Sequence, residues 1–364
     1  MRVRHFEAIR PVCPVCRLQN ESGSPLRIAQ VAREEAGHVT EGVLHCQNPN
    51  CLREFPIIDG IPIIVANIRQ YIADNILAIY GRRDLCEVTE SMLGDCSGPG
   101  SIFDVARQHL SSYAWDHYAE LDPQEPIGEP RPGSMVRTMK IGLEMAEPVP
   151  AGPVIDVGCS VGRGSFALAE RRAELVLGVD LNFPMLRVAS EILRHGTARY
   201  PRRRVGLVYD RREFPARFAH QENVDFWACD VIALPFPAST FSLAVSMNVL
   251  DSVYSPHEML LSIARILKPG GKLVLSCPYD WSTGATPLEA WMGGHSQRSP
   301  AAGSSEALLR SLLTPGAHGS SINDLALIAE RDQIPWHVRL HDRSTMTYSS
   351  HIIAATRTNP DGGN

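Results

Sequence analysis

Residues that could bind a charged ligand follow one another in a short glycine-rich stretch. Residues 154–157 are apolar except for Asp156, which predicts a buried strand that carries one carboxylate. A glycine-containing turn comes next, with Gly158, Ser160 and Gly162, and residues 165–170 have a helical composition. Glycines permit close approach of the backbone, and free N–H groups at the start of a helix attract anions. The stretch therefore predicts a ligand-binding turn between a strand and a helix.

Further polar residues follow other apolar segments that we interpret as strands. Residues 175–179 lead into Asp180, an acid that can accept hydrogen bonds from both hydroxyls of a ribose. Residues 224–229 lead into Asp230 and Val231. Ligands of open parallel sheets bind beyond the carboxyl ends of the strands. The residues just past the expected fourth and fifth strands (243–247 and 272–276) are therefore further candidates: Asn248, Asp251, Tyr279, Asp280 and Trp281.

These signals, in this order, resemble the S-adenosylmethionine (SAM) site of class I SAM-dependent methyltransferases. The resemblance implies an α/β fold, a doubly wound Rossmann-like methyltransferase sheet with a C-terminal antiparallel hairpin over residues 334–341 and 345–356. It implies that Asp180 meets the ribose and Asp230 the adenine amino group. The cofactor-binding residues that it implies are Asp156, Gly158, Ser160, Gly162, Asp180, Asp230, Val231 and Asn248. The alternative is a structural turn in another doubly wound protein.

Three motifs more specifically resemble the methyltransferase domain that ends ovothiol synthases, where mercaptohistidine is N-methylated. They are residues 156–166, 248–251 and 278–294, and the similarity covers roughly residues 150–357. The resemblance implies N-methylation of a small amino-acid-like or imidazole-bearing metabolite. Our catalytic candidates, which would orient the acceptor and take up its proton, are Tyr279, Asp280 and Asn248. Asp280 stands where that family often has threonine.

Four of the nine cysteines form two short-spaced pairs, Cys13/Cys16 and Cys46/Cys51. Tetrahedral zinc prefers four soft ligands, and such pairs supply two each. Together with the segment at 53–65, the pairs resemble the small zinc-ribbon proteins that activate tRNA and translation-factor methyltransferases. We therefore expect a structural zinc ion on Cys13, Cys16, Cys46 and Cys51, with a task in folding and docking. The alternatives are a metal-free remnant or four ordinary thiols.

The elements that must position these residues divide the chain into four parts. We expect a zinc-ribbon-like domain at 1–66, a helical linker or lid region at 67–150, a class I SAM-dependent methyltransferase domain at 151–358 and a flexible tail at 359–364. Within the lid region, helices are expected at 68–80, 102–121 and 135–145, and a turn at 94–100. Three residues here either cover the pocket or pack a helix on the sheet: Tyr113, Tyr118 and Arg137.

The sequence contains two basic segments, and each is compatible with two roles. The segment 198–222 contains seven arginines, which fit either a nucleic-acid groove or a solvated excursion. In the C-terminal hairpin, His337, Arg339 and His341 would share one face of a strand, where Arg339 could pair with a substrate carboxylate. Exposure of that face to solvent explains the pattern equally well.

Composition limits the remaining choices. The net charge of −5 gives no overall attraction for nucleic acid, so nucleic acid is a possible partner that we do not favour. No run approaches the ~20 apolar residues of a membrane span, and the N-terminus lacks a signal-peptide core, so we expect a cytoplasmic protein without membrane contact. The alternatives to a metabolite enzyme are an RNA or protein methyltransferase that docks through the ribbon, and a non-catalytic SAM-binding scaffold with a protein partner.

Overall fold

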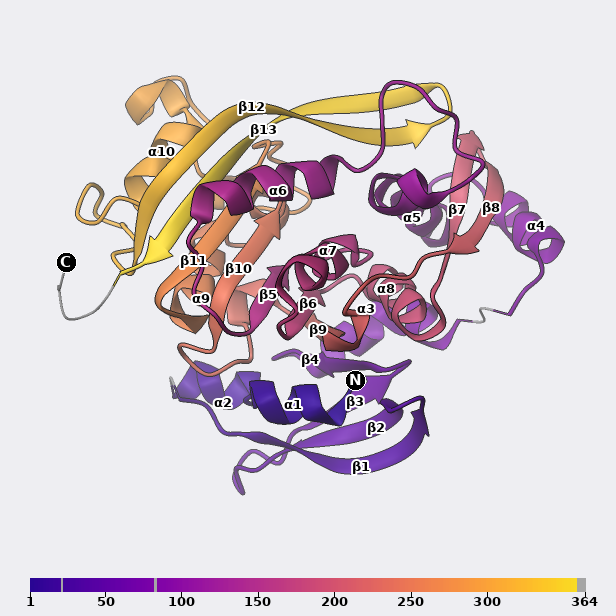
Figure 1. Ribbon diagram of the computed structural model, residues 1–364, viewed down its shortest axis with the longest axis horizontal. Coiled ribbons are helices and arrows are strands. Elements are labelled where there is room, and N and C mark those ends of the chain that lie inside the picture. The colour runs from indigo at the N-terminus through magenta and orange to yellow at the C-terminus, as the bar shows by residue number, and fades with distance from the viewer. Residues whose placement is uncertain (21, 82–83, 359–364) are drawn as a thin grey trace.

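The computed structural model describes residues 1–20, 22–81 and 84–358, and over these residues one eleven-stranded sheet runs through the molecule (Figure 1). Its order is β1-β2-β3-β4-β9-β6-β5-β10-β11-β13-β12. The strands from β4 to β11 in this order are parallel, and β13 and β12 close the edge antiparallel. The strands are β1 (Leu26–Glu35), β2 (His38–Cys46), β3 (Glu54–Ile58), β4 (Ile61–Ile64), β5 (Val154–Val157), β6 (Val176–Asp180), β9 (Val224–Cys229), β10 (Phe241–Met247), β11 (Leu267–Cys277), β12 (Leu325–His341) and β13 (Ser344–Arg357).

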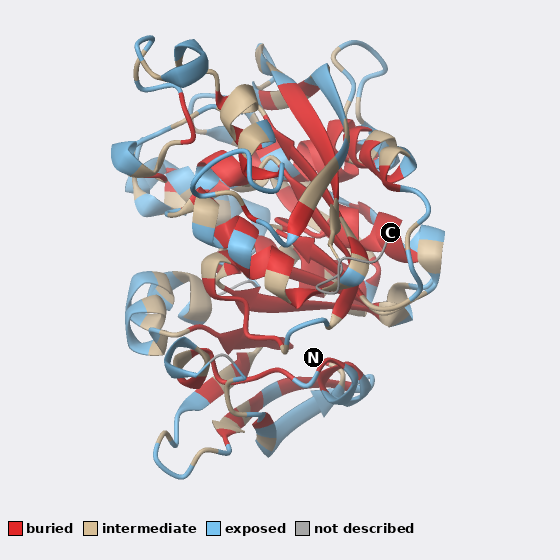
Figure 2. Ribbon diagram, turned by 90° about the vertical axis from the view of Figure 1, so that its left-hand side faces the viewer, coloured by how far each residue is buried: buried red, intermediate tan, exposed pale blue. Residues whose placement is uncertain are grey.

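Helices cover both faces of the parallel strands because the strand side chains alternate between two apolar cores. Ile155 and Val157 of β5 belong to one core, and Val154 belongs to the other. Figure 2 shows the buried residues gathered along these central strands. This is the predicted Rossmann-like sheet with its C-terminal hairpin. The covering helices are α9 (Pro256–Ile266) and α10 (Ser305–Leu312) on the first core, and α6 (Ser134–Ala146), α7 (Arg163–Arg172) and α8 (Phe183–His195) on the second.

The N-terminal strands extend the central sheet rather than standing apart from it. β1 to β4 form an antiparallel meander, preceded by α1 (Val3–Ile9) and α2 (Pro14–Gln19). β4 then pairs in parallel with β9, where Ile63 lies opposite Ala228 and Ile64 opposite Cys229. The sequence motifs indicated a separate unit and gave no sign of this pairing.

Helices fill most of the region between the N-terminal meander and β5. They are α3 (Ile68–Tyr80), α4 (Glu87–Ser97), α5 (Ile102–Tyr118) with the short 3₁₀ segment Ala119–Leu121, and α6. The turn expected at 94–100 is wrong in its first half, because α4 continues to Ser97. Gly94 lies inside this helix, where an added Cβ would meet the guanidinium of Arg107 at 2.1 Å. The glycine thus serves close packing of α4 on α5.

The arginine-rich segment forms a two-stranded hairpin of its own, β7 (Thr197–Val205) and β8 (Val208–Pro215). It lies beside α4 and α5 and next to the far end of the β12–β13 hairpin (Figure 1). Among the residues that the structure describes, no helix combines the length and apolar character needed to cross a membrane. The tail expected at 359–364 lies outside the described residues.

Candidate functional site

A cavity of about 470 Å³ opens at the carboxyl ends of the central strands. β5, β6, β9 and β10 contribute one wall, and α5, α6 and the β12–β13 hairpin contribute the other. The fold therefore brings residues as far apart in sequence as His109 and Tyr348 into one cavity at the carboxyl ends of the parallel strands. The sequence-predicted residues that line it are Tyr113, Asp156, Gly158, Ser160, Asp180, Val231, Asn248, Asp251 and Asp280.

Asp156 lies at the end of β5, where the chain turns into α7. Its side chain is buried, and its Oδ2 accepts a hydrogen bond from the Ser165 hydroxyl at 2.8 Å. Burial raises the pKa of Asp156 to about 7, although the Ser165 hydrogen bond opposes this shift. The turn next to it requires a glycine, because Gly158 has φ +78° and a Cβ there would lie 2.3 Å from Val249.

Asp180, at the end of β6, holds the glycine-rich turn in place. Its carboxylate accepts the backbone N–H groups of Ser160 and Asn182, both at 2.8 Å. Burial raises the pKa of Asp180 above its usual range. The Asn182 side chain accepts the N–H of Met185 and so caps the N-terminus of α8. Asp180 is thereby fixed at the edge of the cavity before any ligand binds.

Two predicted cofactor residues do not line the cavity. Gly162 directly precedes α7 with φ +91°, and a Cβ there would meet Ala189 and Phe226, so this glycine serves packing between α7, α8 and β9. Gly164, two residues farther on and inside α7, lines the cavity in its place. Asp230 accepts the N–H of Ile232 at 3.1 Å, and its neighbour Val231 forms the cavity wall.

The opposite end of the cavity carries an amide and two carboxylates. Asn248 Oδ1 accepts the Ser276 hydroxyl at 2.8 Å, while its Nδ2 has no partner among the described residues. Asp251 is buried and accepts the backbone N–H of Asp280 at 2.8 Å. Asp280 is exposed, and its Oδ2 accepts the hydroxyl of Tyr348 at 2.9 Å. Burial raises the pKa of Asp251, which brings this carboxylate closer to a useful general base.

Tyr279 lies outside the cavity, which corrects its expected position. Its backbone has φ +58°, and its hydroxyl is 2.8 Å from Nδ1 of His351. The other nitrogen of His351 is 3.2 Å from Glu330 Oε2. These contacts tie the loop after β11, which also carries Asp280, to the C-terminal hairpin.

Three residues of α5 line the cavity at helical spacing: His109, Tyr113 and His117. Residues four apart share one face of a helix, so the sequence held this signal although we had named only Tyr113. The other two lid candidates lie elsewhere. Tyr118 is fully buried and donates to the carbonyl of Val161, and Arg137 bonds the carbonyl of Pro132 and the hydroxyl of Ser134.

The C-terminal hairpin presents its other face to the cavity. Trp336 and Val338 of β12 line it, together with Tyr348 of β13. Arg339 alternates with Val338 and therefore points away, where it bonds Asp342 at 3.0 Å and lies over the ring of Trp115. The carboxylate-binding role considered for Arg339 therefore has no support in this geometry.

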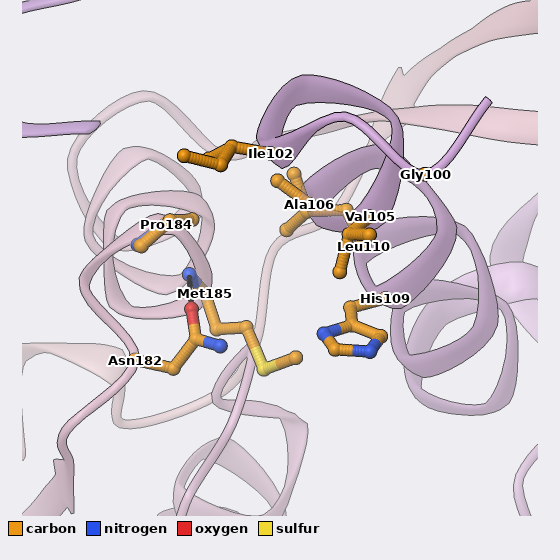
Figure 3. Close-up of a pocket in the computed structure, with 9 residues that line it drawn as sticks. All are labelled: Gly100, Ile102, Val105, Ala106, His109, Leu110, Asn182, Pro184 and Met185. Atoms are coloured by element: carbon orange, nitrogen blue, oxygen red, sulfur yellow. Dashed lines mark hydrogen bonds between the residues drawn. The ribbon is translucent and has the colours of Figure 1, made fainter. Parts of the chain in front are cut away.

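A smaller, mostly apolar pocket adjoins the cavity between α5 and α8. Figure 3 shows Ile102, Val105, Ala106 and Leu110 of α5 facing Pro184 and Met185 of α8. Three residues line both spaces: His109, Asn182 and Met185. The main cavity thus continues into an apolar annex on the Asp180 side.

Comparison with known proteins identifies the core of the chain. Residues 155–275 match the family model described as "Methyltransferase domain". Phosphoethanolamine N-methyltransferase from Triticum aestivum is 26% identical over 141 residues, which are 39% of this chain and 23% of that protein. Ubiquinone biosynthesis O-methyltransferase from Coxiella burnetii is 27% identical over 175 residues, 47% of this chain and 64% of that protein. The chain contains a class I SAM-dependent methyltransferase domain.

The chain is also similar to a solved structure of phosphoethanolamine N-methyltransferase 2 of Haemonchus contortus in complex with S-adenosyl-L-methionine. That structure is 24% identical in sequence, with a TM-score of 0.30, and the match covers 39% of this chain and 28% of that one. The match to the family model begins inside β5 and ends inside β11. It therefore includes the glycine-rich turn, Asp180, Asp230 and Asn248 of the methyltransferase domain.

The four predicted zinc ligands come together next to the methyltransferase domain. The sulfurs of Cys13, Cys16, Cys46 and Cys51 all lie within 4.8 Å of one another. Cys13 and Cys51 are 3.8 Å apart, and Cys16 and Cys46 are 3.7 Å apart. Tetrahedral zinc with Zn–S bonds of about 2.3 Å places its sulfurs about 3.8 Å apart. The side chain of Asn48 donates to Cys16 and its backbone to Cys46, as N–H groups do around bound thiolates. The geometry of the cluster therefore fits a zinc ion.

The arginine-rich hairpin of the methyltransferase domain is largely paired with acids. Arg212 makes a bidentate contact with Asp122, with Nε 2.7 Å from Oδ2. Arg202 bonds Asp342 at 3.0 Å, and Arg211 bonds Glu90. Most of these guanidinium groups are engaged within the protein, which favours a structural task over a nucleic-acid groove.

Proposed function

We propose that this protein is a SAM-dependent methyltransferase that N-methylates a small amino-acid-like or imidazole-bearing metabolite. One observation carries the proposal. A single cavity connects the Asp156–Asp180 end, which suits the polar groups of the cofactor, with the Asn248–Asp280 end, which suits an amine or imidazole. The methyltransferase domain supports the reaction type, and the size of the cavity supports a small acceptor.

At the cofactor end, two acidic residues and one apolar residue each take a different part of SAM. Asp180 accepts from the ribose hydroxyls, Asp156 accepts from the ammonium of the amino-acid moiety, and Val231 packs on the adenine. The neighbouring Asp230 is left with an indirect role, through its hydrogen bond to Ile232. Bound SAM supplies an electrophilic methyl group on a sulfonium. The residues of the cavity contribute chiefly by holding the acceptor in line with that group.

At the acceptor end, the nucleophilic nitrogen must lose its proton before it can attack. Asp280 or Asp251 accepts that proton and passes it to solvent, since Asp280 lies at the open mouth. The nitrogen lone pair forms the new N–C bond, while the electrons of the broken C–S bond remain on sulfur as a neutral thioether. The carboxylates then stabilise the positive charge of the methylated product, and the free Nδ2 donor of Asn248 orients the acceptor.

We also propose that the four-cysteine cluster holds one structural zinc ion. The closed, fourfold thiol set leaves no position for a reacting ligand, so the ion would stabilise the N-terminal strands and take no part in catalysis. Metal analysis of the pure protein should find about one zinc per chain. A content far below this would reject the assignment.

The test of the proposed function is transfer of label from methyl-labelled SAM to host extract, followed by separation by size. We expect label in the small-molecule fraction. Asp280→Asn should slow transfer by roughly 100-fold without weakening SAM binding, because it removes a proton acceptor at the open mouth and leaves the cofactor end of the cavity intact. Label retained with RNA or protein would favour the macromolecular alternative. SAM binding without any transfer would favour the scaffold.

A further inference from the structure

Acidic side chains give the cavity a negative charge that no cationic side chain of its described lining offsets. The carboxylates that line it are Asp156, Asp180, Asp251 and Asp280. Among the lining residues that the structure describes, none is lysine or arginine. Burial lowers the pKa of the two lining histidines, His109 and His117, and brings that of His117 to about 3. Both imidazoles are therefore mainly neutral near pH 7, and the lining presents negative charge alone.

Arginines on the elements around the cavity are turned toward other acids. Arg163, at the start of α7, forms ion pairs with Glu120 and Glu170 at 3.6 and 3.4 Å. Arg339 of β12 bonds Asp342 at 3.0 Å on the far face of the hairpin. The apolar annex has no lysine or arginine among the lining residues that Figure 3 labels. A ligand with an acid group would therefore meet no cationic partner among these residues.

Two of the carboxylates lie next to each other at the acceptor end. Asp251 Oδ2 accepts the backbone N–H of Asp280 at 2.8 Å, and Asp280 Oδ2 accepts the Tyr348 hydroxyl at 2.9 Å. Burial raises the pKa of Asp251, and repulsion from the charge of Asp280 acts in the same direction. The side-chain amide of Asn248 offers a donor here, but it is neutral. Like charges brought together in a cavity repel more strongly than one neutral donor attracts, so this end disfavours an anion.

We propose that the methyl acceptor is an amine or imidazole base that carries no carboxylate and no phosphate group. This inference rests on the proposed function and narrows it, because it retains imidazole-bearing bases and excludes free amino acids. The protonated base binds between Asp251 and Asp280 and gives its proton to one of them. Its nitrogen lone pair then forms the N–C bond while the C–S electrons remain on sulfur. The methylated product is again a cation, which the same carboxylates stabilise.

The first experiment characterises the labelled small molecule that the unaltered protein forms from methyl-labelled SAM and host extract. At pH 5, amines and imidazoles are protonated and carboxyl groups are ionised, so in electrophoresis the product should move as a cation. Treatment with a carbodiimide and methylamine should leave its mobility unchanged, because only an acid group couples. Movement to the anode, no movement, or a change after coupling would overturn the inference alone. Absence of label from the small-molecule fraction would reject the proposed function, and this inference with it.

The second experiment compares two probes that differ by one carboxylate, histamine and histidine. Calorimetry on the full chain loaded with S-adenosylhomocysteine should show histamine binding at least tenfold more tightly. Ser252 lines the cavity, and its hydroxyl lies 3.4 Å from Asp251 Oδ1, so Ser252→Lys would place an ammonium beside that carboxylate. This variant should narrow the ratio of the two affinities to less than threefold.

Ser252→Gln is the matched control, because it adds a side chain of similar reach without charge. It should leave the ratio of the histamine and histidine affinities unchanged. Equal binding of both probes by the unaltered protein, or a ratio that Ser252→Lys leaves unaltered, would overturn the inference.

Discussion

The acidic cavity and the arginine-rich hairpin are two clusters of opposite charge, and they differ in how far their charged groups are paired within the protein. In the hairpin, Arg202, Arg211 and Arg212 face acids of neighbouring elements. In the cavity, Asp280 keeps one oxygen without a partner among the described residues, and Asn248 keeps a donor. The sequence reveals which residues carry charge, but only the fold reveals which of them are still available to a ligand.

The largest effect should come from breaking a pair in the hairpin. Arg212→Ala leaves Asp122 without its bidentate partner, and the side chain of Asp122 is 1% exposed. An uncompensated buried charge costs about 3–5 kcal/mol, so chemical denaturation should show a loss of this order. Arg204→Ala is the matched control, because Arg204 is 57% exposed and its loss should change stability by less than about 0.5 kcal/mol. Equal losses of stability in the two variants would contradict the distinction between the buried and the exposed arginine.

The next largest effect should arise in the cavity. Asp180→Ala removes the proposed acceptor of both ribose hydroxyls, so SAM affinity should fall about 100-fold, as expected for hydrogen bonds to a charged group. Titration calorimetry measures this directly. Asp210→Ala, which alters an acid of the hairpin, should leave SAM affinity unchanged. An Asp180→Ala protein that is folded and binds SAM normally would place the nucleoside elsewhere.

A smaller effect should follow from the pKa of Asp156, which burial raises to about 7. The proposed contact with the cofactor ammonium needs the ionised carboxylate, which is lost as the pH falls through this value. SAM affinity should therefore fall about tenfold for each pH unit below 7 and level off above it. Asp156→Asn should bind more weakly at pH 8 and show a flatter profile. An unchanged slope in that variant would assign the titration to another group.

The smallest expected effect concerns nucleic acid. Because the hairpin arginines are paired, the protein should retain no more RNA than a neutral protein does in filter binding at low salt. Tight RNA binding that weakens steeply with added salt would show instead that the hairpin arginines leave their acidic partners and bind the nucleic acid.

The sequence predicted the methyltransferase sheet well because its signals are local. Apolar runs that contain an acid or lead into one marked β5, β6 and β9. The pairing of β4 with β9 joins residues about 165 positions apart, and nothing in either strand indicates it. The direction in which the Tyr279 side chain points depends on its left-handed backbone conformation, and tyrosine is not a residue type that indicates such a conformation. Gly162 and Gly164 look alike in sequence, yet only the second lines the cavity.

The most direct test of the account is the structure of the full chain with bound S-adenosylhomocysteine. We predict that the ribose lies against Asp180, the adenine against Val231 and the sulfur toward Asn248 and Asp280. That arrangement would leave the acceptor at the open mouth beside Tyr348. A nucleoside bound in the apolar annex, or a sulfur turned away from Asp280, would contradict the division of the cavity into a cofactor end and an acceptor end.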